Sequence, residues 1–377
     1  MKILIMGFTK VKYMPYMNFY LDALKNSGAD VHVLYWNRDL KAEDLSAYSG
    51  NVFHEFKYYQ EDDEAKIKKI RSFLKYRKFV RRVIKKEKFD FIIALHSLPA
   101  VLLYGVLKKK YNNRFIFDYR DYTYESFAPF KKIVAGLTKR SYATFVSSDA
   151  YRKFLPEEYS YKIYTSHNIL FDSLNHRDER ETHGVASDKI RIAFWGFIRH
   201  FELNKIIIKK ISEDKRFELH YYGREQQTAV DLKKYVQELR ADNVFFHGEY
   251  VPEDRYEFIR KTDIIHNIYF DTNTMSAMGN KFYDGLIFYL PQICMEGSFM
   301  ADSAERLGIG LACSPYEDNF TDEIYNYFIG IDKNKFRENC DIALEKILDE
   351  YKTGVKIVTG CVVAEKLRHS FGEKYGK

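Results

Sequence analysis

Short apolar runs alternate with longer amphipathic stretches along most of the chain. Runs that are apolar at consecutive positions are typical of strands buried on both faces, as in parallel sheets. The stretches between them are long enough for the crossover helices that parallel strands require, for example 15–27 and 99–110. The first half contains six such runs: 2–8, 30–36, 89–97, 114–121, 143–148 and 161–166. This pattern predicts a doubly wound α/β domain.

The polar, charged stretch 172–189 interrupts the pattern, and we interpret it as a linker. Beyond Asp318 the pattern predicts helices only. Between these two points the pattern restarts with six further runs: 190–197, 216–223, 243–250, 263–270, 290–295 and 308–314. We therefore predict two Rossmann-like domains, residues 1–175 and 190–350, and a C-terminal helix at about 360–377 that packs back on the first domain. The alternative is one large sheet with an exposed loop.

The composition indicates a folded protein, since 46% of the 377 residues are hydrophobic. No run of about 18 apolar residues predicts a transmembrane helix. The start of the chain, MKILIMGF, lacks the length and cleavage site of a signal peptide. Four scattered cysteines without a C-x-x-C pair indicate a reducing compartment and argue against zinc and against a disulfide framework. We therefore expect a cytoplasmic protein.

Segment 66–88 concentrates the positive charge, with twelve Lys or Arg residues and one acid. A basic amphipathic helix can place its apolar side on the sheet and its cations on an anionic membrane, or it can be a solvated face only. We expect peripheral association with the inner face of the membrane. No nucleic-acid motif accompanies this charge, so nucleic acid is not an expected partner. The predicted apolar stripe consists of Ile67, Ile70, Phe73, Leu74, Phe79, Val80, Val83 and Ile84.

Glycines follow the predicted strands at the end where open α/β sheets bind ligands. They are Gly7, Gly196, Gly223, Gly248 and Gly279. There is no dinucleotide fingerprint or P-loop, which argues against a dehydrogenase and a P-loop enzyme. The chain also lacks a D-x-D sequence, so we expect neither a metal nor a metal-bridged diphosphate.

A helix predicted to begin near Asn280 would offer free backbone N–H groups and a positive dipole end to an anion. Lys281 in its first turn adds a charge suited to phosphate. Asp284, one turn later, could accept hydrogen bonds from ribose hydroxyls. These residues suit a nucleoside diphosphate. The alternative is that Lys281 and Asp284 form an ordinary surface ion pair three residues apart.

The stretch NKFYDGLIFYLPQI, residues 280–293, resembles a motif of the retaining GT-B glycosyltransferases of the large family-four group. IAFWGFIRH (192–200), HYYGREQQ (220–227) and VFFHGEYVPEDRYEFIRKTDII (244–265) resemble further segments of that family. The resemblance implies a GT-B fold, two Rossmann-like domains facing across a cleft. It also implies sugar transfer from a nucleoside-diphosphate sugar without a cofactor. One departure is Ser276, which stands where the family has an acid eight residues before Asp284.

The resemblance also implies roles for single residues. Lys281 and Arg199 would contact the diphosphate, Asp284 the ribose, and the backbone near 249–251 the base. The implied nucleotide-sugar site comprises Gly7, Gly196, Arg199, Gly223, Glu249, Tyr250, Val251, Asn280, Lys281 and Asp284.

In the first domain the resemblance places His96 at the transferred sugar or leaving phosphate. Asp121 and Arg120 could face the acceptor hydroxyl, where a carboxylate can assist deprotonation. The alternatives are a buried histidine bonded to a loop carbonyl and a structural salt bridge. The candidate catalytic residues are therefore His96, Asp121, Arg199 and Lys281.

Three functional hypotheses remain. The first is a transferase that moves a hexose or N-acetylhexosamine, with a UDP-sugar favoured, to a lipid-linked glycan or oligosaccharide in cell-surface polysaccharide synthesis. The second is a catalytically weak or inactive GT-B protein that binds a sugar nucleotide or a partner. The third is a sugar-nucleotide epimerase.

Overall fold

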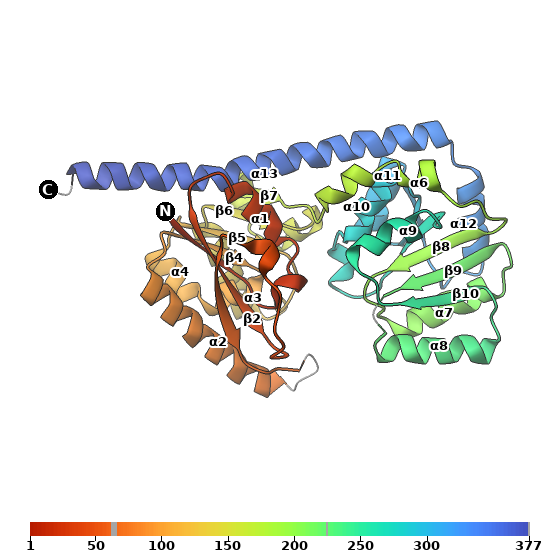
Figure 1. Ribbon diagram of the computed structural model, residues 1–377, viewed down its shortest axis with the longest axis horizontal. Helices are drawn as coiled ribbons and strands as arrows, with labels where there is room; N and C mark the ends of the chain where they lie inside the picture. The colour runs from red at the N-terminus through yellow and green to blue at the C-terminus, as the bar shows by residue number, and fades with distance from the viewer. Residues whose placement is uncertain (62–65, 224, 376–377) are drawn as a thin grey trace. The chain divides into compact units, whose positions relative to one another are not determined.

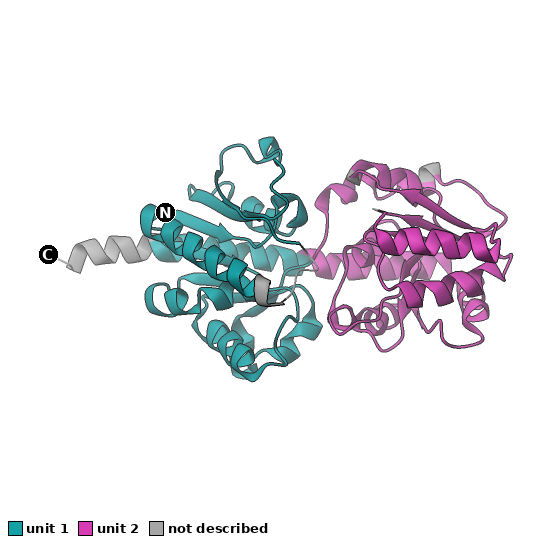
Figure 2. Ribbon diagram, turned by 90° about the horizontal axis from the view of Figure 1, so that it is seen from below, with its two compact units in different colours: residues 1–167, 349–377 teal, residues 168–348 magenta. Residues whose placement is uncertain are grey.

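The computed structural model describes residues 1–61, 66–223 and 225–375. The chain divides into two compact units (Figures 1 and 2). Unit 1 contains residues 1–167 and 349–377, and unit 2 contains residues 168–348. Each unit is built on one parallel sheet, so the predicted fold class of two doubly wound α/β units is confirmed.

Unit 1 holds a seven-stranded sheet in the order β3-β2-β1-β4-β5-β6-β7. Its strands are β1 (Lys2–Met6), β2 (Asp30–Asn37), β3 (Val52–Lys57), β4 (Phe91–Leu95), β5 (Phe115–Tyr119), β6 (Ala143–Val146) and β7 (Ile163–Thr165). Six of them match the predicted runs. The sequence pattern missed β3, because this edge strand is half exposed and carries His54, Glu55 and Lys57 among its apolar residues.

The helices of unit 1 cover both faces of its sheet. On one face α1 packs with part of α13 around Ile5, Tyr20 and Phe145. The predicted helix 99–110 is in fact two helices, because the chain turns at Leu103. The elements are α1 (Met17–Leu24), α2 (Lys66–Glu87), α3 (Ser97–Leu102), α4 (Tyr104–Lys110), α5 (Ala128–Arg140) and the 3₁₀ turns η1 (Val11–Tyr13), η2 (Ser46–Tyr48), η3 (Asp149–Phe154) and η4 (Glu157–Lys162).

Helix α2 confirms the helical prediction for the basic segment but corrects its apolar face. Val80, Val83 and Ile84 are buried as expected, and Tyr76 joins them. Ile70 and Leu74 instead expose 57% and 55% of their surface. The buried face therefore begins later along the helix than the hydrophobic pattern indicates. The side chains of residues 66–68, including Ile67, lie outside the described part of the chain.

Unit 2 holds a six-stranded sheet in the order β10-β9-β8-β11-β12-β13. Its strands are β8 (Ile190–Trp195), β9 (Phe217–Tyr222), β10 (Val244–Gly248), β11 (Ile264–Asn267), β12 (Gln292–Met295) and β13 (Gly310–Cys313). In both units the strand order reverses beside the first strand, between β1 and β4 and between β8 and β11. Open α/β sheets form their ligand sites at such switch points.

The helices of unit 2 begin before its first strand. They are α6 (Glu179–His183), α7 (Phe201–Ser212), α8 (Gln227–Leu239), α9 (Arg255–Ile259), α10 (Asn280–Ile287), α11 (Phe299–Leu307) and α12 (Phe320–Ile329), with η5 (Phe171–His176), η6 (Pro252–Asp254) and η7 (Thr274–Ser276).

The interpretation of 172–189 as a linker is wrong. Its first part forms η5 and α6, and Arg180 bonds Asp263 while Glu179 pairs with Arg260.

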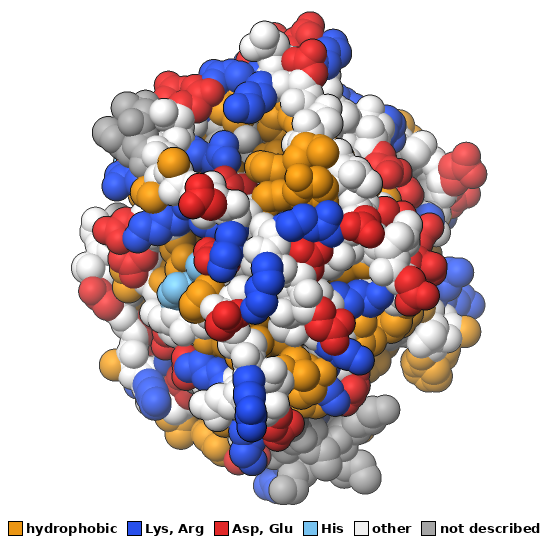
Figure 3. All heavy atoms as spheres, turned by 90° about the vertical axis from the view of Figure 1, so that its right-hand side faces the viewer, with side chains coloured by type: hydrophobic (Ala, Val, Ile, Leu, Met, Phe, Trp, Pro, Cys, Tyr) orange, Lys and Arg blue, Asp and Glu red, His pale blue; other side chains and the backbone are white. Residues whose placement is uncertain are grey.

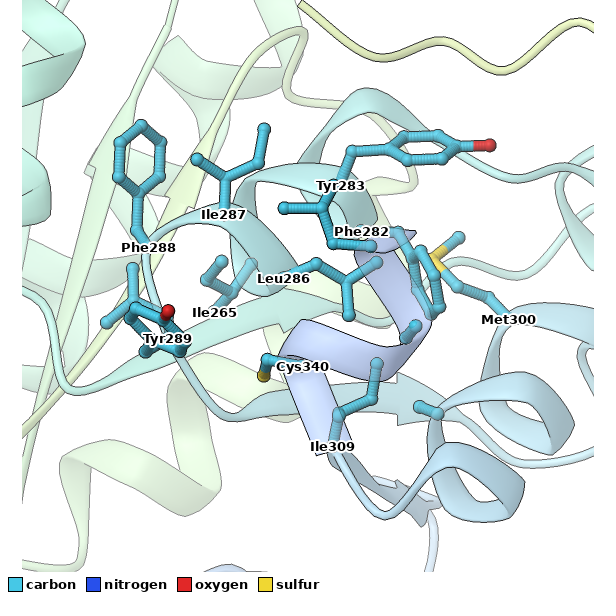
Figure 4. Close-up of a cluster of buried hydrophobic side chains, with 14 of the residues drawn as sticks. Ile265, Phe282, Tyr283, Leu286, Ile287, Phe288, Tyr289, Met300, Ile309 and Cys340 are labelled. Atoms are coloured by element: carbon cyan, nitrogen blue, oxygen red, sulfur yellow. The ribbon is translucent and has the colours of Figure 1, made fainter. Parts of the chain in front are cut away.

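Helix α10 begins at Asn280 as predicted, and every residue from 281 to 287 is buried. Phe282, Leu286 and Ile287 gather with Ile265 of β11 and Cys340 of α13 in one hydrophobic cluster (Figure 4). Because residues 281–287 are all buried, packing against the surrounding core fixes the positions of Lys281 and Asp284.

The long helix α13 (Lys333–Tyr375) belongs to both units, since the boundary falls between residues 348 and 349. Cys340 and Leu344 pack in the unit 2 cluster, whereas Val358 and Cys361 pack in the unit 1 cluster. Residues 376–377 of the predicted C-terminal helix lie outside the described residues. Among the helices that the structure describes, none has the length and apolarity needed to cross a membrane.

Candidate functional site

Two glycines shape the switch point of unit 2. Gly196 directly follows β8 and has φ +126°, a backbone conformation that L side chains rarely adopt. Its N–H donates to the Tyr222 carbonyl at 2.9 Å. A Cβ atom at Gly223 would overlap the Gly196 carbonyl oxygen. Gly196 is therefore needed for its backbone conformation, and Gly223 because the two strand ends come unusually close together.

The ammonium of Lys281 lies next to Gly196, because a Cβ there would be 3.9 Å from Nζ. Lys281 is 8% exposed, donates to the Tyr269 hydroxyl, and places Nζ 4.1 Å from the centroid of the Phe194 ring. Burial lowers the pKa of Lys281 to about 7, although Asp284 acts in the opposite direction. A buried cation with a lowered pKa beside an open main-chain turn is suited to anion binding.

Asp284 is 2% exposed and its carboxylate already has two partners. The indole N–H of Trp195 donates to Oδ2 at 2.9 Å, and Arg255 lies 3.7 Å from Oδ1. Burial raises the pKa of Asp284 despite these partners. The alternative interpretation of Lys281 and Asp284 as a surface ion pair is wrong, because both side chains are buried.

The other candidate residues around this switch point are more exposed. Arg199 is exposed and stacks over the Phe197 ring at 4.8 Å, and Asn280 is exposed at the first position of α10. His200 follows Arg199, and its Nε2 lies 3.3 Å from Asp271 in the loop after β11. Burial lowers the pKa of His200, which favours the neutral imidazole beside Asp271.

Glu249 and Tyr250 border a recess of about 520 Å³ on unit 2, and Val251 follows them. Glu249 and Val251 are exposed, and Tyr250 is half-buried with its ring 5.2 Å from the ring of Phe258. The backbone N–H of Val251 donates to Asp254 at 3.0 Å. Burial, and after it the charge of Asp284, raises the pKa of Tyr250 to about 12, so this stretch adjoins the switch-point group.

In unit 1 the structure joins His96 to Asp121 and adds a third residue. His96 Nδ1 lies 2.9 Å from Asp121 Oδ2, and the Tyr16 hydroxyl is hydrogen-bonded to His96 Nε2. Burial raises the pKa of Tyr16, so its hydroxyl stays neutral and can donate. His96 is therefore not bonded to a loop carbonyl through its ring. It has φ +71°, a strained backbone of the kind found at functional sites.

The remaining candidates of unit 1 have structural partners. Arg120 is 4% exposed and bonds Asp118 through Nη1 at 2.9 and 3.1 Å, so it does not face an acceptor and the salt-bridge alternative is correct for it. Gly7 donates its N–H to Leu34 and accepts a 2.5 Å hydrogen bond from Tyr76.

The predicted residues thus form two groups: His96 with Asp121 in unit 1, and the switch-point group around Gly196 and Lys281 in unit 2, which residues 249–251 adjoin. Sequence patterns missed Tyr16, Trp195, Tyr269 and Arg255. In the sequence, the aromatic residues look like ordinary core residues. Only their hydrogen bonds to residues far away in the sequence show that they belong to the candidate site. In the described part of the chain, no group of three or more His, Cys, Asp or Glu residues has a metal-binding arrangement.

No protein-family model and no curated protein matches the chain. Solved structures do match it. Sucrose-phosphate synthase from Thermosynechococcus elongatus superposes with a TM-score of 0.70 at 12% identity, covering 98% of this chain and 99% of that one. HepE from Anabaena in complex with UDP gives 0.68 at 13% identity, covering 96% and 100%. UDP-GlcNAc 2-epimerase from Neisseria meningitidis bound to UDP-GlcNAc gives 0.58 at 12%, covering 98% and 100%. The chain therefore has the fold of the GT-B glycosyltransferases.

Proposed function

We propose that the protein is a retaining, metal-independent glycosyltransferase. It transfers a hexose or N-acetylhexosamine from a nucleoside-diphosphate sugar, with a UDP-sugar favoured, to a lipid-linked glycan in cell-surface polysaccharide synthesis. The observation that carries this proposal is the buried ammonium of Lys281 beside Gly196 at the switch point of unit 2. Structures of the same fold bind UDP or UDP-GlcNAc, which supports such a donor.

The chemistry assigned to each group follows from its charge. Negative charge builds up on the diphosphate as the glycosidic bond breaks, and Lys281 and Arg199 stabilise it. No resident metal or cofactor is proposed for this step. In unit 1, Asp121 orients His96 through Nδ1, which leaves Nε2 for a sugar hydroxyl or phosphate oxygen in place of Tyr16. Asp284 contacts ribose only if one carboxylate oxygen exchanges its present partner for a hydroxyl.

We also propose that the protein works in the cytoplasm at the inner face of the membrane, held by α2. This helix combines exposed cations with the exposed Ile70 and Leu74. Such a surface suits anionic lipid, both by charge and by its apolar area.

Release of nucleoside diphosphate tests the catalytic proposal. Purified protein is incubated with a panel of UDP-sugars, with and without EDTA, and free UDP is measured. We expect slow donor hydrolysis that EDTA leaves unchanged. Lys281→Met should lower the rate by about a hundredfold, since one buried charged donor is worth about 2.7–4 kcal/mol in a transition state. Lys234→Met, an exposed lysine on α8, is the matched control.

One observation favours the second candidate, a protein that binds sugar nucleotide without transferring sugar. Ser276, in place of the family's first acid, is buried with 3% exposure and offers no carboxylate to a sugar. UDP binding without release of UDP from any donor in the panel would support this candidate. Conversion of the donor sugar into its epimer would indicate the third hypothesis.

A further inference from the structure

Unit 1 carries a groove of about 970 Å³ between the second half of α2 and the end of α4. Helix α2 runs through Lys88 into β4, and α4 runs through Arg114 into β5. The groove therefore lies at the amino ends of these strands. His96 and Asp121 follow the carboxyl ends of the same strands, so the groove is distinct from the candidate site.

The charged residues that line the groove are all positive. Its floor is apolar, formed by Ile84, Phe89, Val106 and Tyr111. Among the lining residues that the structure describes, none is acidic. The other eight are cationic: Lys78, Arg81, Arg82, Lys85, Lys88, Lys109, Lys110 and Arg114. By contrast, basic and acidic side chains are interspersed over the face shown in Figure 3.

The positive charge of the groove is hardly neutralised by the protein itself. Arg114 lies 3.6 Å from Glu365. Over the described ranges 1–61, 66–223 and 225–375, no ion pair involves any of the other seven cations. The acid of the basic segment, Glu87, lies within 3.3 Å of Lys2 and 3.6 Å of Lys86, neither of which lines the groove.

Cations near the last turn of a helix offset its dipole, which accounts for part of this arrangement. Lys109 and Lys110 end α4 and fit this explanation. Lys78 and Arg81 do not, because they lie more than one turn before the end of α2 at Glu87. Their positions at i and i+3 put them on one helix face, towards the groove. A polyanion bound in the groove would relieve the repulsion among these like charges further than screening by salt does.

We propose that this groove is a binding site for a ligand with two or more neighbouring phosphate groups. Separate cations from α2 and α4 can bond to different phosphates at once, and the apolar floor can take a lipid or sugar portion. The phosphates can belong to a lipid headgroup or to a soluble compound. The proposal does not depend on sugar transfer, because no groove-lining residue is a candidate site residue and the groove is tested by binding alone.

Sodium tripolyphosphate is the soluble probe, with binding measured by calorimetry at about 150 mM salt to screen long-range attraction. Two variants remove two cations each, Arg81→Gln with Arg82→Gln on α2 and Lys109→Gln with Lys110→Gln on α4. Each should weaken binding at least about tenfold, since hydrogen bonds to charged groups are worth about 1.5–3 kcal/mol. Circular dichroism checks that these variants fold.

The matched control removes the same charge from the same helix outside the groove, by Arg71→Gln with Arg77→Gln. It should change the affinity by less than about twofold. Equal weakening in all three variants would show a diffuse field and overturn the proposal. So would unchanged binding in the α4 variant, or a single-stranded oligonucleotide that binds through the groove more tightly than tripolyphosphate.

Vesicles separate the two sources of phosphate. Cardiolipin, with two phosphates per headgroup, is compared with phosphatidylglycerol at equal total charge. A preference for cardiolipin that both groove variants abolish identifies a lipid headgroup. Binding of tripolyphosphate through the groove without such a preference identifies a soluble ligand. Both results support the site, whereas groove-independent binding of both probes refutes it.

Discussion

At the scale of single residues, Lys281 combines burial with a charge that an anionic ligand would favour. Its pKa is lowered to about 7 by burial, so close to neutral pH the free protein holds the side chain partly deprotonated. A diphosphate next to the ammonium would raise this pKa again. Binding of a donor should therefore take up a proton above about pH 7.

This coupling predicts the pH dependence of donor affinity. UDP-glucose carries no group that titrates near neutrality, so its affinity should be constant below about pH 7 and fall as the pH rises further, by at most tenfold per pH unit. Calorimetry from about pH 6 to about pH 9 measures this. In Lys281→Met the affinity should be weak and independent of pH. A slope that survives in this variant would assign the titration to another group.

The same burial predicts that Lys281 destabilises the ligand-free fold. Because its pKa is lower in the folded than in the unfolded chain, the unfolded chain binds more protons between about pH 7 and pH 10.5. The contribution of Lys281 to the free energy of unfolding therefore increases with pH between about pH 7 and pH 10.5 and is lowest below about pH 7. Lys281→Met should raise the melting temperature at pH 7 while it weakens UDP binding, a separation of stability from function. Thermal unfolding with and without UDP checks both, and the Lys234→Met control should change neither.

Asp284 is predicted to be essential for folding as well as for any ribose contact. Asp284→Ala would leave Arg255 buried without its carboxylate and Trp195 without its acceptor, at a cost of about 3–5 kcal/mol in unfolding free energy. Asp284→Asn keeps an acceptor for Trp195 and should lose less. Urea unfolding measures both variants. An alanine variant as stable as the wild type would show that this buried pair contributes nothing to the fold.

At the scale of elements, α2 presents Ile70 and Leu74 to solvent beside its cations. If this face meets a membrane, the double variant Ile70→Ser with Leu74→Ser should bind anionic vesicles more weakly. Each side chain buried in lipid contributes up to about 1.5–3 kcal/mol. Unfolding free energy should change by less than about 0.5 kcal/mol, because both residues are exposed. Vesicle flotation decides the point, and Val230→Ser, another exposed apolar residue, is the control.

The contrast between β4 and β3 explains what the sequence could and could not predict. A continuous apolar run predicts a strand that is buried on both faces, such as β4 with its run Phe91–Leu95. The edge strand β3 mixes polar and apolar residues, and η5 and α6 are short polar turns, so pattern alone predicts loops there. The same limit applies to the site. Lys281 could be predicted from a motif, whereas Tyr16 and Trp195 owe their contacts to residues 80 and 89 positions away.

At the scale of the whole molecule, unit 1 depends on a segment that follows unit 2 in the sequence. Val358, Cys361 and Val362 pack in the core around Ile5 and Phe145. A chain that stops at Leu348 should therefore leave this core open, with a loss of several kcal/mol, since each large apolar side chain removed costs about 2–5 kcal/mol. Unit 2 should keep its fold and its affinity for UDP. Limited proteolysis and UDP calorimetry on this truncated chain test both statements.

The two-part composition of unit 1 also sets an order of events during synthesis. Domains generally fold as the ribosome releases them, beginning with the N-terminal one. Here residues 168–348 form a continuous unit and can fold as soon as they emerge. Residues 1–167 emerge before unit 2, yet their hydrophobic core stays uncovered until residues 349–362 are made. This segment is thus translated before unit 2 but completed after it, and throughout that interval it presents an apolar surface that a chaperone would recognise.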